Sequence, residues 1–337
     1  MQAELRDSLK ELFPDCQVMS ADRPAPTLDV ARGGTAALHI LVTGLKKGDP
    51  LKLSLRPSGK QAKASALKPE WFELLAVPVE KNTGFDGFVE KPDRPNLHII
   101  RRAPFEVYDA MKPIQPPVKA SGPTLAFRLH LPVPLKARPG RRAFRIEVAC
   151  GRETVRLEAV VQVHAAEVPE AGATSFPYTN WFSYEHIAGR HGLKMWSEPH
   201  WKMLRRYADL MVRARQNTFW IPLGAIFERT PNGPVLDAKR LERIVSVFTA
   251  AGMHWIEGGH FAARAGGLWT APTFDVSLKG PAATSVAGNA DIASIGRQLM
   301  EVIRAKRWQD RWLQHVADEP ISQNAVDYRI LIGIVRK

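Results

Sequence analysis

The stretch TLAFRLHLPVPLKARPGRRAFRIEVACGRETVRLEAVVQVHAAEVP, residues 124–169, contains three series in which every second residue is apolar. These series begin at Leu125, Phe144 and Val155. A period of two is the pattern of strands with one buried face, and the Pro139-Gly140 pair between the first two series is typical of a turn. The stretch therefore predicts consecutive β-strands.

The same alternation occurs upstream, from Leu38 to Val42 and from Leu51 to Leu55. Short strands that follow one another with turns and without helices between them favour two packed sheets. We therefore predict an N-terminal β-sandwich domain in residues 1–168.

Downstream of Pro169 the pattern changes, because short apolar or aromatic runs now alternate with segments of helical period. The expected strands are 176–182, 218–223, 253–257 and 312–317; the expected helices are 198–215, 237–251, 291–305 and a last one from about 324. Asp237 is a suitable cap for the second helix, and Gly252 a suitable end.

Four β/α units in succession predict parallel strands with crossover helices, in a barrel or in an open doubly wound sheet. The GxGxxG and GxxxxGK[ST] motifs of nucleotide-binding sheets are absent. We therefore predict a multidomain β plus α/β protein, in which 169–337 holds the first four β/α units of a TIM-type (β/α)8 barrel. Such barrels typically take about 250 residues, so we expect a C-terminally truncated catalytic domain that need not be active by itself.

Composition excludes several classes of protein. With 45% hydrophobic and 24% charged residues, the chain is neither disordered nor collagen-like. The net charge is +13, but residues 1–165 hold 26 Lys and Arg against 18 Asp and Glu, and the remainder holds 21 against 16. Because the excess is spread over both halves and no aromatic-interleaved basic motif accompanies it, a solvated basic surface is favoured over a nucleic-acid interface.

Location and cofactors follow from absences in the sequence. No apolar run approaches the roughly 20 residues of a membrane-spanning helix. The N-terminus as written lacks the apolar core of a signal peptide, which favours a cytoplasmic protein; a different true start would allow secretion or a periplasmic location. Cys16 and Cys150 form no metal-binding motif, so we expect two thiols and no cofactor.

The fourth run ends in a pair of adjacent carboxylates, Asp318 and Glu319, followed by Pro320. Like charges at this range disfavour joint ionisation, so one carboxyl tends to stay protonated, as general acid catalysis requires. Functional residues of a barrel gather at the C-terminal ends of its strands, and the proline bends the chain there, so both side chains can reach the mouth. Taken alone, the pair also fits an exposed cap of the next helix.

Other strand ends carry aromatic, amide, imidazole and carboxylate side chains: Asn180, Trp181, Trp220, Glu257, His260, Trp269 and His315. Aromatic faces that stack on sugar C–H groups, with polar groups that fix hydroxyls, make a carbohydrate pocket. Each tryptophan taken singly also fits packing between strand and helix. The two histidines lack a third ligand at a recognisable spacing, so no metal site is expected.

Four segments resemble glycoside hydrolase family 123: TNWFSYEHIAGRHG (Thr179–Gly192), RQNTFWIPL (Arg215–Leu223), IEGGHFAARAGG (Ile256–Gly267) and, most specifically, QHVADEP (Gln314–Pro320). FEVYDAMKPI (residues 105–114) and FRLHLPVPLKARPG (residues 127–140) resemble the N-terminal β-sandwich of that family. The resemblance covers most of the chain from about residue 100.

The resemblance implies a retaining β-N-acetylhexosaminidase, in the best-known members a β-N-acetylgalactosaminidase, and hence a carbohydrate partner. Such enzymes use substrate assistance, in which the 2-acetamido oxygen attacks the anomeric carbon and gives an oxazolinium intermediate. By this resemblance Glu319 is the general acid and base, and Asp318 orients the acetamido group.

Two alternatives remain open at this stage. One is a retaining or inverting glycosidase in which a second protein carboxylate, such as Glu257, takes part. The other is a non-catalytic carbohydrate-binding protein. The sugar epimer, endo or exo action and the oligomeric state are not specified by these residues.

Overall fold

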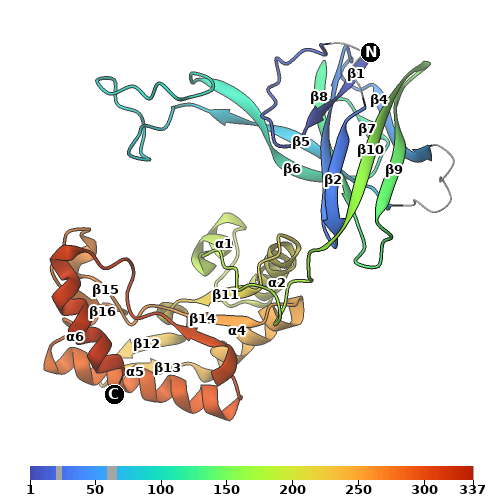
Figure 1. Cartoon of the computed structure of the whole chain (residues 1–337). Helices are drawn as coiled ribbons and strands as arrows, with labels where there is room; N and C mark the ends of the chain where they lie inside the picture. The colour runs from blue at the N-terminus through green and yellow to red at the C-terminus, as the bar shows by residue number, and fades with distance from the viewer. Residues whose placement is uncertain (20–24, 59–66, 337) are drawn as a thin grey trace. The chain divides into compact units, whose positions relative to one another are not determined.

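The computed structural model describes residues 1–19, 25–58 and 67–336. By its contacts the chain divides into two compact units, Met1–Pro169 and Glu170–Lys337 (Figure 1). Each unit has its own apolar core.

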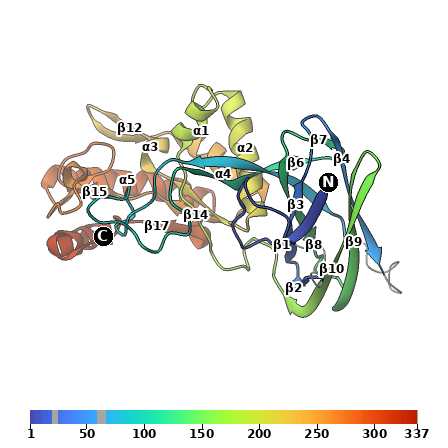
Figure 2. The ribbon, with the colours of Figure 1, turned by 90° about the horizontal axis from the view of Figure 1, so that it is seen from above.

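The first unit consists of two five-stranded sheets (Figure 2). One sheet has the order β1 (Gln2–Asp7), β3 (Thr35–Thr43), β8 (Thr124–Pro132), β5 (Glu70–Val79) and β6 (Phe105–Ile114), with all neighbours antiparallel. The other has the order β2 (Thr27–Arg32), β10 (Glu153–Glu167), β9 (Gly140–Cys150), β4 (Pro50–Ser58) and β7 (Val118–Lys119), in which only β2 and β10 pair in parallel.

The five period-two series of the sequence lie in β3, β4, β8, β9 and β10, so those strand predictions are confirmed. Their alternate side chains form one core between the sheets, in which Phe127 of β8 and Phe144 of β9 are fully buried. The apolar faces of two sheets thus cover each other, as the alternation requires.

His39 of β3 makes the stability of this unit depend on pH. Burial and the Arg128 guanidinium, whose Nη1 lies 3.1 Å from His39 Nε2, lower the pKa of His39 from 6.5 to about 4; the Asp7 carboxylate opposes them and His130 adds to them. Because the unfolded chain then binds the proton at higher pH than the folded one, the free energy of unfolding falls as pH drops from 6.5 to about 4 and levels off below that.

A variant isolates this effect. His39→Gln keeps an acceptor for Arg128 and does not titrate. Between pH 7 and pH 4, the free energy of unfolding of this variant should therefore fall by up to about 3 kcal/mol less than that of the wild type. Urea unfolding of both proteins, followed by circular dichroism at the two pH values, measures the difference. An equal loss in both proteins would exclude His39 as the titrating group.

The second unit is built on three parallel strands in the order β11 (Thr218–Ile221), β14 (Trp255–Gly258) and β17 (Trp312–Gln314). Its helices are α1 (Tyr184–Arg190), α2 (Glu198–Arg213), α3 (Leu223–Ile226), α4 (Ala238–Ala251), α5 (Val286–Ala305) and α6 (Ala325–Val335). Two hairpins complete it, β12 (Phe227–Thr230) with β13 (Gly233–Leu236), and β15 (Ala262–Arg264) with β16 (Phe274–Val276).

The ends of α4 agree with the sequence prediction. The Asp237 carboxylate accepts a hydrogen bond from the backbone N–H of Arg240 at 2.9 Å and caps the helix. Gly252 ends it in the left-handed conformation, with φ of +113°. The predicted helices at 198–215, 291–305 and from 324 are also present, within a few residues at their ends.

One predicted strand is wrong, because residues 176–182 form no ladder. The carbonyl of Tyr178 accepts from the N–H groups of Asn217 and Thr218, at 3.2 and 3.1 Å, and its N–H donates to the Asn217 side chain at 2.8 Å. Pro177 has no N–H to extend a ladder. The first of the four β/α units is therefore an extended segment fixed beside β11 by the Asn217 side chain.

Among the described residues, no helix is long and apolar enough to cross a membrane. Cys16 and Cys150 are free thiols.

Candidate functional site

Four of the predicted site residues lie at or just beyond the carboxyl ends of the three parallel strands: Trp220, Glu257, His260 and His315. Beyond β11 and β14 the pairing continues for one residue, because Gly259 N–H donates to the Ile221 carbonyl at 2.8 Å and His315 N–H donates to that of Gly258 at 3.1 Å. His260 and His315 therefore leave the sheet at the same edge.

Two tryptophans and two histidines form one cluster at this edge. The Trp181 and Trp220 rings stack with centroids 4.8 Å apart, and the His260 and His315 rings make T-shaped contacts with Trp181 at centroid distances of 5.3 and 5.8 Å. Trp220 is buried, whereas Trp181 is 48% exposed. Trp220 is thus held within the protein, whereas the Trp181 ring stacked on it is accessible to a ligand.

Glu257 lies within this cluster and is 5% exposed. Its Oε1 accepts from Trp181 Nε1 at 2.9 Å and contacts His315 Nε2 at 2.6 Å. Its Oε2 is buried without a partner among the described residues. A buried acceptor without a partner is costly, so this oxygen is available to a donor that the site admits.

His260 is the second buried group with unused hydrogen-bonding capacity. Burial, then the charge of His315, lowers the pKa of His260, against the opposing carboxylates of Asp318 and Glu257. The imidazole is therefore neutral at pH 7 and carries one donor and one acceptor. Within the described residues its Nε2 is buried without a partner.

Asp318 lines a hollow of about 310 Å³ next to this cluster. The hollow shares His260 with the cluster and is also lined by Ala262, Ala263, Arg264, Gly267 and Trp269. The Arg264 guanidinium lies over the Trp269 ring, with Cζ 4.0 Å from the centroid. Trp269 is 57% exposed, so much of its surface is accessible.

Two predicted residues lie apart from these groups. Asn180 is exposed, and its Nδ2 donates to the Tyr178 hydroxyl at 2.7 Å. Glu319 is exposed and does not line the hollow, although it directly follows Asp318. The structure therefore brings together Trp181, Trp220, Glu257, His260 and His315, and places Asp318 and Trp269 around the adjoining hollow.

Sequence reasoning missed Gln314 and Arg264. Gln314 Nε2 donates to the carbonyls of Gly259 and His315, and its Oε1 accepts from Trp312 Nε1 at 3.0 Å, so it ties the end of β14 to that of β17. A signal for both existed, since each lies in a segment that carried the family resemblance, but neither residue type is distinctive by itself.

The described residues contain no group of three His, Cys, Asp or Glu side chains arranged to hold a metal ion.

Gly259 allows the end of β14 to approach β11 closely. A Cβ there would lie 2.7 Å from Pro222 Cα, 2.8 Å from Leu223 N and 3.0 Å from the Ile221 carbonyl, all backbone atoms. Gly259→Ala should therefore force the two strand ends apart and lower the free energy of unfolding by about 1–3 kcal/mol.

Urea unfolding followed by tryptophan fluorescence tests this prediction. Gly296→Ala in α5 is the matched control, because a Cβ there meets no atom within 4 Å and alanine favours a helix. If Gly259→Ala is as stable as the control, the end of β14 does not approach β11 as closely at Gly259 as described.

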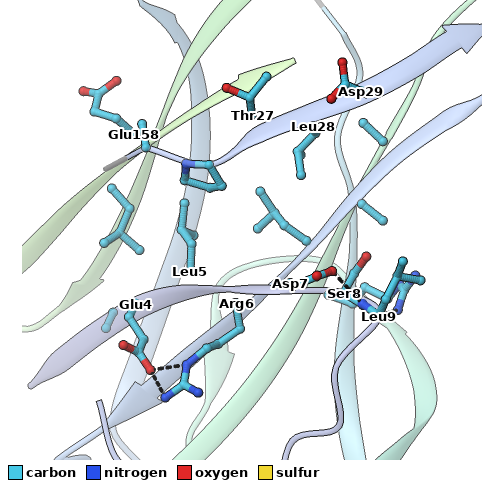
Figure 3. A pocket seen from close by; sticks show the side chains of 18 of the residues that line it. Glu4, Leu5, Arg6, Asp7, Ser8, Leu9, Thr27, Leu28, Asp29 and Glu158 are labelled. Atoms are coloured by element: carbon cyan, nitrogen blue, oxygen red, sulfur yellow. Dashed lines mark hydrogen bonds and ion pairs between the residues drawn. The ribbon is translucent and has the colours of Figure 1, made fainter. Parts of the chain in front are cut away.

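A larger hollow, of about 810 Å³, lies in the first unit between β1 and β2 (Figure 3). Leu5 and Leu28 point into the space between the strands. Charged side chains around it have partners: Glu4 pairs with Arg6, Asp29 with His164, and Glu158 with Arg145. It contains none of the predicted site residues.

No protein-family model matches the chain, and no curated protein matches it. Two solved structures have TM-scores too low to indicate a shared fold. One is MyfA, the major subunit of Myf fimbriae from Yersinia enterocolitica, in complex with galactose (TM-score 0.19, 10% identity, 48% of this chain and 96% of that one). The other is a putative alpha-galactosidase from Bacteroides fragilis (TM-score 0.24, 8% identity, 92% of this chain and 48% of that one).

A third structure matches over the whole chain. It is a family 123 glycoside hydrolase from Clostridium perfringens, studied for glycolipid glycan hydrolysis, with a TM-score of 0.71 at 11% identity. The match covers 100% of this chain and 61% of that one, so this chain spans less than two thirds of its structural relative. At this identity the likeness is one of fold, and the chain has the fold of the matched part of a family 123 glycoside hydrolase.

Proposed function

We propose that this protein is a glycoside hydrolase that cleaves β-linked N-acetylhexosaminides, in particular N-acetylgalactosaminides, with retention of configuration. The observation that carries the proposal is the position of Asp318, which lines a hollow with His260 and the exposed Trp269, with Glu319 as the next residue. The fold likeness to a family 123 glycoside hydrolase supports the same class of reaction.

The chemistry assigns different work to the two carboxyls. The acetamido oxygen of the substrate attacks the anomeric carbon while the bond from that carbon to the glycosidic oxygen breaks, and Glu319 donates its proton to the leaving oxygen. Asp318 accepts from the acetamido N–H and stabilises the positive charge of the oxazolinium. Water then attacks the anomeric carbon while the bond from that carbon to the acetamido oxygen breaks, and Glu319 takes a proton of that water.

The neighbouring side chains fit the binding of the sugar. The exposed parts of the Trp181 and Trp269 rings offer apolar surface to C–H groups. Glu257 Oε2 and His260 Nε2 are among the buried polar side-chain atoms without partners in the described chain, and hydroxyl groups of a sugar satisfy such atoms. Asn180 and His315 complete the proposed set of substrate-binding residues.

We extend the proposal to the architecture. The two sheets of Met1–Pro169 are interpreted as a β-sandwich domain, and Glu170–Lys337 as part of a (β/α)8 barrel whose strand ends form the site.

Hydrolysis of p-nitrophenyl β-N-acetylgalactosaminide and of its gluco isomer tests the activity. We expect p-nitrophenolate release, and proton NMR should show the β-anomer as the first product. Release of the α-anomer would contradict retention. Sugar binding without release would make the chain a carbohydrate-binding protein and overturn the hydrolase proposal.

A second candidate is a glycosidase in which Glu257 acts as the second carboxylate. The unpartnered Oε2 of Glu257 favours it. Glu257→Gln distinguishes the two candidates. If Glu257 is a nucleophile or base, the variant loses that group and kcat falls. If the reaction is substrate-assisted, Glu257 is needed for binding alone and the change is mainly in KM.

A further inference from the structure

Glu319 has a backbone conformation that its sequence disfavours. Its φ is +40°, in the left-handed region, where the Cβ of an ordinary residue approaches the following carbonyl. The next residue is Pro320, and the residue before a proline is driven towards extended conformations. Such a conformation persists only where neighbouring contacts hold it.

The segment that begins β15 runs beside the segment that carries Glu319. Phe261 N–H donates to the His315 carbonyl at 3.4 Å, and Ala262 N–H donates to that of Val316 at 3.1 Å. Farther along, Arg264 Nη2 donates to the Glu319 carbonyl at 2.5 Å. Two backbone hydrogen bonds are thus followed by a third, made by the charged side chain of Arg264 to the carbonyl of Glu319, the residue with positive φ.

Arg264 is itself held in place. Its guanidinium lies over the Trp269 ring, with Cζ 4.0 Å from the ring centroid. Hydrogen bonds from a cation to a carbonyl are stronger than neutral ones. The planar guanidinium stacks and donates at once, which a lysine ammonium cannot do.

We propose that Arg264 is a positioning residue for Glu319, whose backbone it fixes in the left-handed conformation through the carbonyl and so sets the direction of the Glu319 side chain relative to Asp318. The inference rests on the proposed function, because direction matters only if the Glu319 carboxyl transfers a proton. Rotation about N–Cα of Glu319 moves its Cβ, and misplacement of a reacting group by about 1 Å costs on the order of 10²-fold in rate.

The test compares three variants of the full chain. Arg264→Ala removes the stack and the hydrogen bond, and Arg264→Lys keeps the charge alone. Arg229→Ala is the matched control, because Arg229 Nε donates to the carbonyl of Leu278, another residue with positive φ (+74°), at 3.0 Å and lies outside the site. Two readouts are measured: hydrogen exchange of the peptide 314–324, and kcat and KM for methyl β-N-acetylgalactosaminide, whose leaving group needs the proton of Glu319.

We expect Arg264→Ala and Arg264→Lys to exchange faster in that peptide and to lose kcat by about 10- to 100-fold, with KM changed less than about threefold. Millimolar guanidinium should restore part of the kcat of Arg264→Ala. Arg229→Ala should match the wild type in both readouts.

Each other result overturns the inference in a recognisable way. Unchanged kcat in an active Arg264→Ala variant excludes positioning and leaves the proposed function intact. Equal losses in Arg229→Ala show a general loss of stability, and a fully active Arg264→Lys shows that charge alone suffices. A wild-type chain that hydrolyses no substrate defeats the proposed function and with it the role of Arg264.

Discussion

Glu319→Gln is expected to lower kcat for methyl β-N-acetylgalactosaminide by about 10²- to 10⁴-fold, the usual range for loss of general acid–base catalysis. An amide cannot protonate the glycosidic oxygen, and methoxide is a poor leaving group that needs the proton. With a p-nitrophenyl leaving group, which departs without protonation, the first step should be affected much less. This dependence on the leaving group identifies Glu319 as the acid.

Asp318→Asn should produce a loss of the same order with both leaving groups, because the charge that stabilises the oxazolinium is needed whichever alcohol departs. Asp310→Asn is the matched control, since Asp310 is an exposed carboxylate in the turn before β17. Initial rates at saturating substrate measure all three variants. Turnover within about tenfold of the wild type for both Glu319→Gln and Asp318→Asn would refute the assignment.

Phe248→Ala is expected to destabilise the second unit by about 3–5 kcal/mol. The Phe248 ring is fully buried and lies between α4 and β11, stacked on Phe219 with centroids 5.0 Å apart and close to Phe182 at 5.4 Å. Its loss leaves a cavity beneath the strand that carries Trp220.

Tryptophan fluorescence in urea reports this unit selectively, because eight of the nine tryptophans lie after residue 169 and only Trp71 precedes it. Phe248→Leu retains most of the buried volume and should lose clearly less than Phe248→Ala. Similar stability of the alanine variant and the wild type would show that Phe248 is not in the core.

The parts of the fold that the sequence predicted are those with a regular burial pattern. β8, β9 and β10 alternate because one face of each is buried, and α4 carries both a capping Asp237 and a closing Gly252. β6 was not predicted as a strand from periodicity, since most of its residues are exposed at the edge of its sheet and no alternation results.

The site was predictable to the extent that parallel strands bring their carboxyl ends together. This explains why Trp181, although not on a strand, meets Glu257 and His315, since Asn217 ties its segment to β11. The role of Arg264 was not predictable, because its contact with the Glu319 carbonyl depends on a left-handed backbone that no sequence pattern marks.

The central claim is that the acetamido group of the substrate takes part in the reaction at Asp318 and Glu319. The most direct measurement compares kcat/KM for p-nitrophenyl β-N-acetylgalactosaminide with that for p-nitrophenyl β-galactoside, which has a hydroxyl in place of the acetamido group. We predict turnover of the first substrate and none detectable of the second. Comparable turnover of both would contradict substrate assistance and favour a second protein carboxylate.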